Sequence, residues 1–267
     1  TGGLVPASFD PAGDGGLTPA MAVLVGARVA VRYHAVPDGP EEGPFVELLL
    51  DLARCSEAPP GEATALPPTE LEVFIASGCP NCPTAVRAAL ALAAASPGLS
   101  VVVIDVAERP DRAGEIGVRS VPMIVASGGL TVVGAISAAE LAARLAESRG
   151  PAGAAVVLES YLEAGRFAAA GEALAAGRGH EAFLERWGAG GLERRMGLVL
   201  AADEALQQDP GALDALVPGL LPLLGPGDLA RRGDTADLLG RIGHPAARPA
   251  LEAMRAEADE DLAEAAA

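Results

Sequence analysis

Two of the three cysteines, Cys79 and Cys82, lie three positions apart in the stretch FIASGCPNCPTAV (residues 74–86). A CxxC pair can bind half of a zinc site, form a structural disulfide, or exchange electrons as a dithiol. The run ELEVFIA (70–76) before the pair predicts a strand, and PTAVRAALALAAA (83–95) after it predicts a helix. At such a junction Cys79 meets the helix N-terminus, where unpaired N–H groups and the helix dipole stabilise a thiolate. The pattern indicates redox chemistry, in which Cys79 attacks and Cys82 resolves the mixed disulfide.

The competing interpretations need residues that the sequence does not supply in the right places. Zinc requires two more ligands, but Cys55, His34, His180 and His244 are scattered singly. A cysteine protease requires a histidine near the thiolate, and residues 70–150 contain none. A structural disulfide remains open, although so small a loop would give little stabilisation. These considerations favour redox chemistry without a bound metal.

Composition and charge restrict the partners. The length of 267 residues allows two domains, and with only 3% aromatic residues the core must be filled by small and aliphatic side chains. A formal net charge of −17 leaves no basic surface for phosphates, which argues against nucleic acid and against anionic membranes. No apolar run approaches the roughly 20 residues that span a bilayer. No signal peptide is visible, and three cysteines are too few for a secreted disulfide framework. We therefore expect a cytoplasmic location.

The part of the chain before the CxxC unit divides into a lead-in, a strand–helix piece and a linker. Residues 1–20 are rich in Gly, Pro and Asp and predict a flexible lead-in. Within residues 21–68, ARVAVRYHAV (27–36) alternates like a strand and EEGPFVELLLDLARC (41–55) has helical spacing. A Pro-rich linker, APPGEATALPP, follows. These residues predict a partial strand–helix unit and a linker.

The CxxC unit itself, residues 69–150, is predicted to be α/β. After the CxxC helix, LSVVVIDV (99–106) is an apolar run typical of a strand covered on both faces. VPMIVAS and LTVVGA predict two further strands. SAAELAARLAES (137–148) predicts a closing helix, with Ser137 as N-cap and Glu140 completing a capping box. The predicted order is β-α-β-(short helix)-β-β-α.

The remaining residues, 151–267, are predicted to be all-α, because no convincing strand occurs there. Gly, Pro and Asp divide this region into short helices, which suggest a stacked helical solenoid. The predicted helices are 153–164, 166–177, 180–188, 192–207, 211–224, 228–240, 245–256 and 259 to the end.

An internal similarity in this region supports a repeat array. PGLLPLLGPGDLARRGDTA resembles PALEAMRAEADEDLAEAAA at one constant offset, which aligns Pro218 with Pro249 and Asp228 with Asp259. The segment DLARRGDTADLLGRIGHPAARPALEAM resembles HEAT-type repeats, and residues 192–206 resemble an earlier, degenerate copy. The matching positions are Asp228, Arg232, Leu239, Gly240, Ile242, Gly243 and Pro249. This resemblance implies a HEAT-like domain that binds another protein or extends a scaffold.

The CxxC unit resembles the thioredoxin superfamily. The resemblance rests on a strand, CPxC, a helix, an apolar strand and, some forty residues downstream, IGVRSVPMIV. Its VRSVP segment resembles the cis-proline loop of that family, which implies a cis bond between Val121 and Pro122. It also implies that this loop faces the CxxC and that the backbone of Val121, supported by Pro122, binds an extended substrate strand.

Within the superfamily, the absence of Trp before Cys79 distinguishes this sequence from thioredoxin, which has WCGPC. The segment ELEVFIASGCPNCPTAV resembles glutaredoxin-like units of protein disulfide oxidoreductases and the N-terminal domain of the alkyl hydroperoxide reductase flavoprotein. Those proteins fuse two units and keep the working CxxC in the second. The resemblance implies that residues 21–68 are the remnant of a first unit. It further implies a protein disulfide as substrate, a flavin-dependent reductase as electron donor, and no cofactor bound to this chain.

Three other residues invite a role. Val73 occupies the position of the buried aspartate of thioredoxin, and the neighbouring Glu72 is a candidate proton acceptor for Cys82, or simply a solvent-facing strand carboxylate. Asp105 is expected to have a structural role at the end of a strand. Cys55 is interpreted as a buried core residue, with an electron-relaying thiol as the alternative.

The sequence therefore predicts a thiol–disulfide oxidoreductase whose helical-repeat domain recruits a protein partner. The direction of electron flow stays open, because reductants, oxidants and isomerases share this fold. The alternative is a non-catalytic scaffold or adaptor, in which the HEAT-like repeats bind a partner and the CxxC is vestigial or structural.

Overall fold

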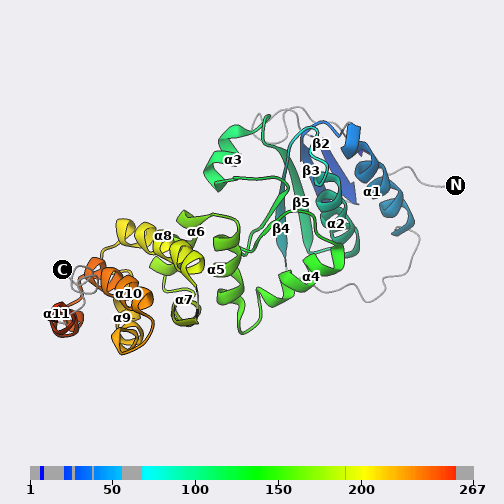
Figure 1. Ribbon diagram of the computed structural model, residues 1–267. Helices are drawn as coiled ribbons and strands as arrows, with labels where there is room; N and C mark the ends of the chain where they lie inside the picture. The colour runs from blue at the N-terminus through cyan, green and yellow to red at the C-terminus, as the bar shows by residue number, and fades with distance from the viewer. Residues whose placement is uncertain are drawn as a thin grey trace. The chain divides into compact units, whose positions relative to one another are not determined.

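The computed structural model describes residues 7–8, 21–25, 28–37, 39–55, 68–189 and 191–256 (Figure 1). The chain forms two compact units, Thr1–Ala164 and Gly165–Ala267. The first unit is α/β and contains the CxxC pair. In the second unit, every regular element of the described residues is a helix.

The first unit is built on one sheet of seven strands in the order β1-β2-β3-β5-β4-β6-β7. Strands β3, β5 and β4 are parallel, and the remaining pairs are antiparallel. Six of the seven residues of β5 are buried, as its unbroken apolar sequence predicts for a strand covered on both faces. The strands are β1 (Ala7–Ser8), β2 (Met21–Val25), β3 (Arg28–His34), β4 (Thr69–Ile75), β5 (Leu99–Asp105), β6 (Met123–Ala126) and β7 (Thr131–Val133).

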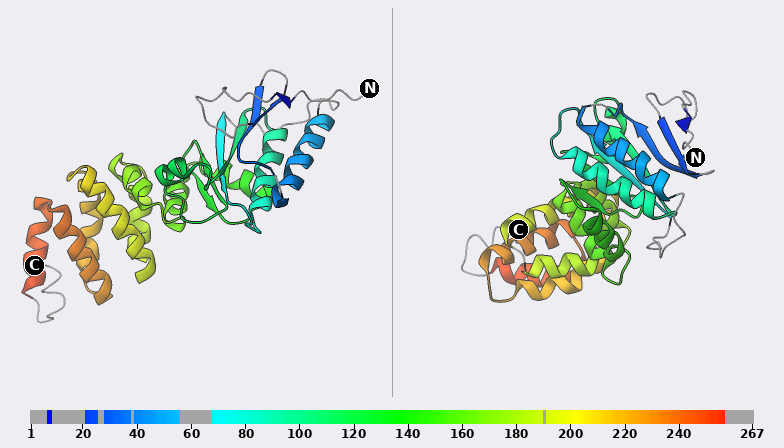
Figure 2. Two further views of the ribbon diagram at one scale, coloured as in Figure 1. Left: turned by 90° about the horizontal axis from the view of Figure 1, so that it is seen from above. Right: turned by 90° about the vertical axis from the view of Figure 1, so that its right-hand side faces the viewer.

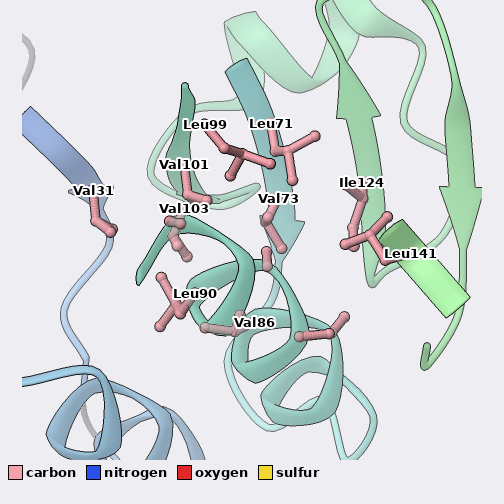
Figure 3. Packing of buried hydrophobic residues seen from close by; sticks show 14 of the residues in the cluster. Val31, Leu71, Val73, Val86, Leu90, Leu99, Val101, Val103, Ile124 and Leu141 are labelled. Carbon is pink, nitrogen blue, oxygen red and sulfur yellow. The ribbon is translucent and has the colours of Figure 1, made fainter. Parts of the chain in front are cut away.

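Helices α1 (Glu42–Cys55), α2 (Cys82–Ala95) and α4 (Ala138–Glu147) cover one face of this sheet. Figure 2 shows α1 and α2 side by side on that face. Helix α3 (Pro110–Ile116) covers the other face, together with Ala164, which follows α5 (Gly153–Glu163). The core between the sheet and α2 is aliphatic (Figure 3). It includes Leu71, Val73, Val86, Leu90, Val101, Val103, Ile124 and Leu141.

The predicted order of the CxxC unit is confirmed, with α3 as its short helix. Ser137 is the N-cap of α4, as predicted: its Oγ accepts a hydrogen bond from the backbone N–H of Glu140 at 3.2 Å. The Ser137 hydroxyl also donates to the Glu140 carboxylate at 3.3 Å. The Ser137 cap thus fixes the start of the last helix of this unit, and the Glu140 carboxylate bonds to the Ser137 hydroxyl rather than to its backbone N–H.

The structure adds strands that the sequence analysis did not predict. Strand β2 forms an antiparallel hairpin with β3, and Ala7–Ser8, within the predicted flexible lead-in, pairs with β2. The order β2-β3-α1 is the same as that of β6-β7-α4, a hairpin followed by a helix. Strand β3 pairs with β5 in parallel, so this segment extends the sheet of the CxxC unit. Residues 56–67, in the predicted linker, lie outside the described residues.

Helix α5 belongs to the first compact unit, although the sequence analysis places the start of the helical domain at residue 151. It packs on β7, where the N–H of Thr131 donates to Ser160 Oγ at 3.0 Å. The turn before β7 is close to α5: a Cβ added to Gly129 would lie 2.6 Å from the Tyr161 hydroxyl and 3.1 Å from Val157 Cγ1. These contacts explain why the unit ends at Ala164 rather than at residue 150.

The second unit confirms an all-helical region, and its helices agree with those predicted except at residues 211–224. That segment consists of three short pieces, because Pro218 and Pro222 each remove a backbone N–H.

Trp187 of the second unit is fully buried, and its Nε1–H donates to Thr235 Oγ1 at 2.9 Å. The predicted helix from residue 259 lies outside the described residues. The main helices are α6 (Phe167–Ala175), α7 (His180–Ala189), α8 (Leu192–Gln208), α9 (Val217–Leu220), α10 (Leu229–Ile242) and α11 (Arg248–Arg255). None of the helices that the structure describes is long and apolar enough to cross a membrane.

The close approach of α5 to the β6–β7 turn predicts a large effect at Gly129. This residue has φ +96°, which side chains rarely adopt, and its Cβ would meet Tyr161 and Val157. Gly129→Ala should lower the free energy of unfolding by about 2 kcal/mol. The adjacent Gly128→Ala is the control, since no atom lies within 4 Å of its added Cβ. Urea denaturation measures both variants, and equal stabilities would contradict the packing of α5 on this turn.

The hydroxyl of Tyr33 and Oε2 of Glu41 are buried in the first unit without a hydrogen-bond partner among the described residues. Tyr33 is fully buried on β3, and Glu41, just before α1, is 8% exposed. Burial raises the pKa of Glu41 from its ordinary value of 4.5 to about 7, partly offset by the attraction of Arg87. Burial, and then the negative charge of Glu41, raise the pKa of Tyr33.

The raised pKa of Glu41 predicts a stability that depends on pH. Between about pH 4.5 and 7 the folded protein retains a proton that the unfolded chain has lost, so this contribution to stability falls as the pH rises. Glu41→Gln should therefore be more stable than the wild type above pH 7, by about 1–3 kcal/mol, and similar to it below pH 4.5. Denaturation curves from pH 4 to 8 measure this. Glu42→Gln, at an exposed position, should keep the wild-type dependence, and an unchanged dependence in Glu41→Gln would refute the assignment.

Candidate active site

The CxxC pair lies where the central strand β4 ends and α2 begins. After Ile75 the chain turns, and the N–H of Cys79 donates to the carbonyl of Ala76 at 3.1 Å. Gly78, inside this turn, has φ +77°, a conformation that glycine adopts without steric cost. The turn therefore brings Cys79 directly to the start of α2.

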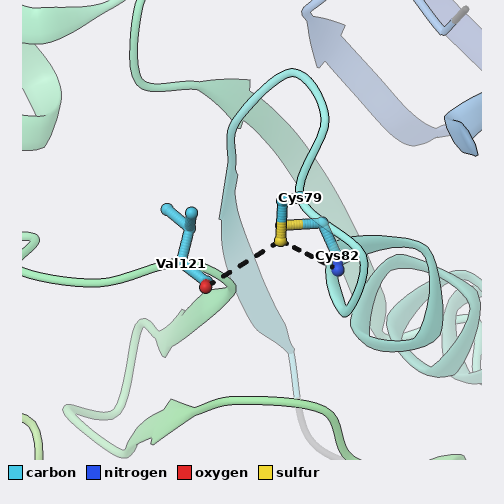
Figure 4. The surroundings of a disulfide bond; sticks show 3 residues. All are labelled: Cys79, Cys82 and Val121. Atoms are coloured by element: carbon cyan, nitrogen blue, oxygen red, sulfur yellow. Dashed lines mark hydrogen bonds between the residues drawn. A yellow bond between two sulfur atoms is a disulfide. The ribbon is translucent and has the colours of Figure 1, made fainter. Parts of the chain in front are cut away.

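The two sulfur atoms form a disulfide, with the Cα atoms 5.5 Å apart. Cys79 is half-buried, whereas Cys82 is fully buried in the core beneath α2. The backbone N–H of Cys82 donates to Cys79 Sγ at 3.1 Å (Figure 4). This N–H belongs to the first turn of a helix, where it has no partner within the helix and would stabilise negative charge on that sulfur. The partly exposed Cys79 is thus the sulfur that a substrate can reach.

Two prolines flank the start of α2. Helix α2 begins at Cys82, with Asn81 as its N-cap residue, so Pro80 precedes the helix rather than lying in its first turn. Pro83 is the second helical residue, where a backbone N–H would lack an intrahelical partner in any case. The proline therefore costs α2 no hydrogen bond, and the N–H that reaches Cys79 comes from Cys82.

The loop before β6 faces the disulfide, and the bond between Val121 and Pro122 is cis, as predicted. The carbonyl oxygen of Val121 lies 3.9 Å from Cys79 Sγ (Figure 4). A disulfide sulfur carries no proton, so a hydrogen bond across this contact requires the reduced thiol. The carbonyl of Pro122 accepts a hydrogen bond from Gly134 at 2.9 Å, which ties the loop to the end of β7.

Glu72 does not lie with the cysteines, and the sequence-based hypothesis that it accepts a proton from Cys82 does not fit the structure. Leu71 and Val73 point into the core that contains Cys82, and successive strand residues alternate between faces, so Glu72 faces the opposite side of the sheet. There Arg112 of α3 donates two hydrogen bonds of 2.8 Å to its carboxylate. These hydrogen bonds, together with one to Glu115, raise the pKa of Arg112.

One row of buried side chains beneath α2 carries no carboxylate. Val73 of β4, Val103 of β5 and Tyr33 of β3 lie in one register across the sheet, and all three are fully buried. Val73 occupies the position where thioredoxin has its aspartate. Helix α2 thus packs on buried aliphatic side chains, and the phenol of Tyr33 is the polar group in this row.

The other sequence candidates are structural or lie outside the described side chains. Asp105 is 8% exposed, and its Oδ1 accepts a hydrogen bond from the N–H of Ala107 at 2.8 Å, as expected for a residue that ends a strand. Cys55 is the last residue of α1, and its side chain lies outside the described part. Among the described residues, no group of three His, Cys, Asp or Glu side chains is arranged to hold a metal ion.

One charged residue beside the site was not identified from the sequence. Arg119 is exposed and lies two positions before Val121, in the loop that faces Cys79. The sequence indicated only that Arg119 lies inside VRSVP, two residues before Val121, whose carbonyl contacts Cys79 Sγ. Whether an acidic side chain neutralises the Arg119 guanidinium can be seen only in the folded structure.

A β-α-β-α-β-β-α unit with a CxxC at the N-terminus of its first helix and a cis-proline loop against the first cysteine defines a thioredoxin-like fold with a dithiol–disulfide site. Residues 69–146 match the family model described as a thioredoxin domain. The thioredoxin of Methanocaldococcus jannaschii is 37% identical over 67 residues, which make up 25% of this chain and 79% of that protein. The chain belongs to the thioredoxin family. It is a thioredoxin-like oxidoreductase in which Cys79 and Cys82 form the CxxC disulfide.

Two solved structures show partial similarity. The alkylhydroperoxide reductase protein AhpF of Enterococcus faecalis is 25% identical, with a TM-score of 0.43, and the match covers 48% of this chain and 64% of that one. A protein disulfide oxidoreductase from Aeropyrum pernix is 28% identical, with a TM-score of 0.38, and the match covers 48% of this chain and 58% of that one. The chain spans less than two thirds of the length of either protein.

The pairing of Glu72 with Arg112 predicts that this carboxylate stabilises the fold without taking part in thiol chemistry. Glu72→Gln should lower the free energy of unfolding by about 1 kcal/mol, because it replaces two charge-assisted hydrogen bonds. The pH titration of the reduced cysteines, followed by thiolate absorbance at 240 nm, should match that of the wild type. Glu70→Gln is the control, since Glu70 is exposed on the same strand. A shifted thiol titration in Glu72→Gln alone would restore the proton-acceptor hypothesis.

Proposed function

We propose that this protein exchanges electrons with protein disulfides, with Cys79 as the nucleophile and Cys82 as the resolving thiol. The observation that carries this proposal is the setting of Cys79 Sγ. It is partly exposed, it accepts the N–H of Cys82 at 3.1 Å, and it lies 3.9 Å from the carbonyl of Val121. A thiolate at this position would be stabilised by the helix N-terminus and open to a substrate.

In the reducing direction the exchange takes two steps. The Cys79 thiolate attacks one sulfur of the substrate disulfide, forms a mixed disulfide and expels the other substrate sulfur as a thiolate, which takes up a proton. Cys82 then gives up its proton, and its thiolate attacks Cys79 Sγ and releases the second substrate sulfur. The CxxC pair ends as the Cys79–Cys82 disulfide, and two electrons have passed to the substrate. The oxidising direction is the same sequence reversed.

Val121 and Pro122 form the proposed substrate platform. The carbonyl of Val121 is next to the reacting sulfur and belongs to a loop segment outside the regular strands, where its backbone can pair with an extended peptide. Pro122 is buried and its carbonyl is bonded to Gly134, which supports the loop from behind. Such a platform would align a substrate disulfide with Cys79 through backbone hydrogen bonds, without contacting the side chains of the substrate.

The electron donor is proposed to be a flavin-dependent reductase, with no cofactor bound to this chain. Support comes from the resemblance of ELEVFIASGCPNCPTAV to units that work with such flavoproteins. The hairpin and helix β2-β3-α1, which share the order of β6-β7-α4, support the related proposal that residues 21–68 are the remnant of a first thioredoxin-like unit.

The helical region, residues 151–267 in the sequence-based division, is proposed to be a HEAT-like repeat array that binds a protein partner. Asp228 caps α10 by accepting hydrogen bonds from Ala230 and Arg231. Arg195 of α8 is 3% exposed and donates to Asp234 of α10 at 2.6 Å. On α8, Met196 and Leu200 are 58% and 44% exposed and lie one helical turn apart, which supports an apolar contact surface for a partner.

A scaffold whose CxxC is vestigial is the competing function, and cysteine variants distinguish the two. Cys79→Ser should reduce the turnover of a protein disulfide such as that of insulin to background. Cys82→Ser should accumulate a covalent mixed disulfide with the substrate, visible on non-reducing gels. The control is Cys55→Ser, which should keep turnover. Full turnover by Cys79→Ser would sink the mechanism, and unchanged partner binding by the double variant Cys79→Ser/Cys82→Ser is what the scaffold hypothesis expects.

The reduction potential of the pair, measured in glutathione or dithiothreitol redox buffers, assigns the direction. A value near about −270 mV indicates a reductant of the thioredoxin kind, and one near about −120 mV indicates an oxidant. Absence of any reversible two-electron transition would leave only the scaffold.

A further inference from the structure

Of the two loops that meet at the disulfide, residues 76–81 and 118–122, one side chain is charged. In the CxxC turn, the exposed residues Ser77, Gly78, Pro80 and Asn81 carry no charge. Across from them, in the loop before Val121, Arg119 and Ser120 are exposed. Within these two loops, Arg119 is therefore the charged group that a substrate at Cys79 can meet.

Arg119 differs from the other arginines of the first unit whose side chains are described. It takes part in no hydrogen bond or ion pair with the described residues, whereas the others each have an acidic or carbonyl partner. The chain contains no lysine, so arginine supplies all 19 of its basic side chains. The ion pairs are Arg32–Glu70, Arg87–Glu47, Arg109–Asp111, Arg112–Glu72 and Arg144–Glu163, while Arg149 donates to the carbonyl of Leu145.

The loop holds Arg119 in a defined place. Val118 packs on the core beneath α3. Its N–H donates a hydrogen bond to the carbonyl of Ala113 at 2.9 Å, just after the C-terminus of α3. Val121 packs against the cores on both faces of the sheet. The chain between two packed valines exposes Arg119 and Ser120, and two residues span at most about 7 Å. The Arg119 backbone is therefore within this distance of Val121, whose carbonyl contacts Cys79 Sγ.

We propose that Arg119 forms an anion subsite that binds a carboxylate next to the disulfide of the substrate. This inference rests on the proposed function and specifies its substrate class: disulfides flanked by Asp or Glu. A guanidinium offers two parallel N–H donors that match a carboxylate, and Arg119 has no internal acid to compete with it. The rest of the chain, with a net charge of −17, repels acidic partners, so the local cation decides which acidic disulfide can approach Cys79.

The carboxylate could belong to a side chain of a protein loop or to a small peptide disulfide such as oxidised glutathione. Both sources present the same group to the same guanidinium. The assay therefore includes a protein-like peptide series and oxidised glutathione as separate substrates.

The test measures kcat/KM for three disulfide peptides that differ only in one residue beside the cysteine: Glu, Gln or Lys. The wild type should prefer the Glu peptide to the Gln peptide by about threefold, as expected for an exposed ion pair. Arg119→Gln should remove this preference, Arg119→Lys should keep part of it, and Arg119→Glu should reverse it in favour of the Lys peptide. Arg144→Gln, which changes the net charge equally on α4, should retain the wild-type preference.

The outcomes separate the inference from the proposed function. If the wild type reduces none of the peptides, the proposed function fails. If it reduces all of them and Arg119→Gln leaves the Glu preference intact, the anion subsite is refuted. If Arg119→Gln slows all three peptides equally and shifts the thiol titration, the guanidinium acts on the Cys79 thiolate and the subsite is likewise refuted. When Arg119→Gln removes the Glu preference, an unchanged turnover of oxidised glutathione assigns protein loops as the source of the carboxylate. A parallel loss of turnover with oxidised glutathione shows that the small disulfide uses the same guanidinium.

Discussion

The hydrogen bond from the Cys82 N–H to Cys79 Sγ depends on how α2 is held against the sheet. A helix N-terminus stabilises charge only over its first turn, so a small displacement of α2 would remove the effect. Alanines supply most of the buried face of α2: Ala85, Ala88, Ala89 and Ala93. Small side chains let the helix backbone approach β4 and β5 closely while α1 packs beside it. The low aromatic content of the chain is therefore part of how the site is positioned.

The site relies on backbone groups because the side chains around it contribute little charge. Val73 and Val103 are buried aliphatic residues, Glu72 is bonded to Arg112 on the far face, and Asp105 accepts a hydrogen bond from the N–H of Ala107 at the end of β5. The groups that contact Cys79 are the N–H of Cys82 and the carbonyl of Val121. Backbone dipoles keep their position whatever the pH, so the thiolate would be stabilised by groups that do not titrate.

The sequence was sufficient to predict the parts of the site that are local. The strand and the helix around the CxxC follow from short patterns whose residues are adjacent in the chain. The cis Val121–Pro122 bond was implied by the resemblance of VRSVP to the cis-proline loop of the thioredoxin superfamily. Glu72 was misplaced although ELEVFI already alternates, because a shift of one residue changes the face of a strand. Its true partner, Arg112, is 40 residues away in the sequence. The local sequence around Glu72 does not indicate an ion pair with a residue so far away in the chain.

The two ends of the first unit were harder to predict, and for one physical reason: both concern the edges of the sheet. An exposed strand edge has unpaired N–H and carbonyl groups that must be paired or covered. On one side β2 pairs with β3, and only two residues separate the two strands. The apolar run MAVLV that forms β2 is short, so the sequence gives only a weak indication of this hairpin. On the other side Ser160 of α5 accepts the outward N–H of Thr131. In the sequence, Ser160 lies between Glu159 and Tyr161 in the second half of α5, and nothing local shows that it covers a strand edge. The boundary of the unit is thus set by hydrogen-bond demand at β7, which extends it through α5 to Ala164.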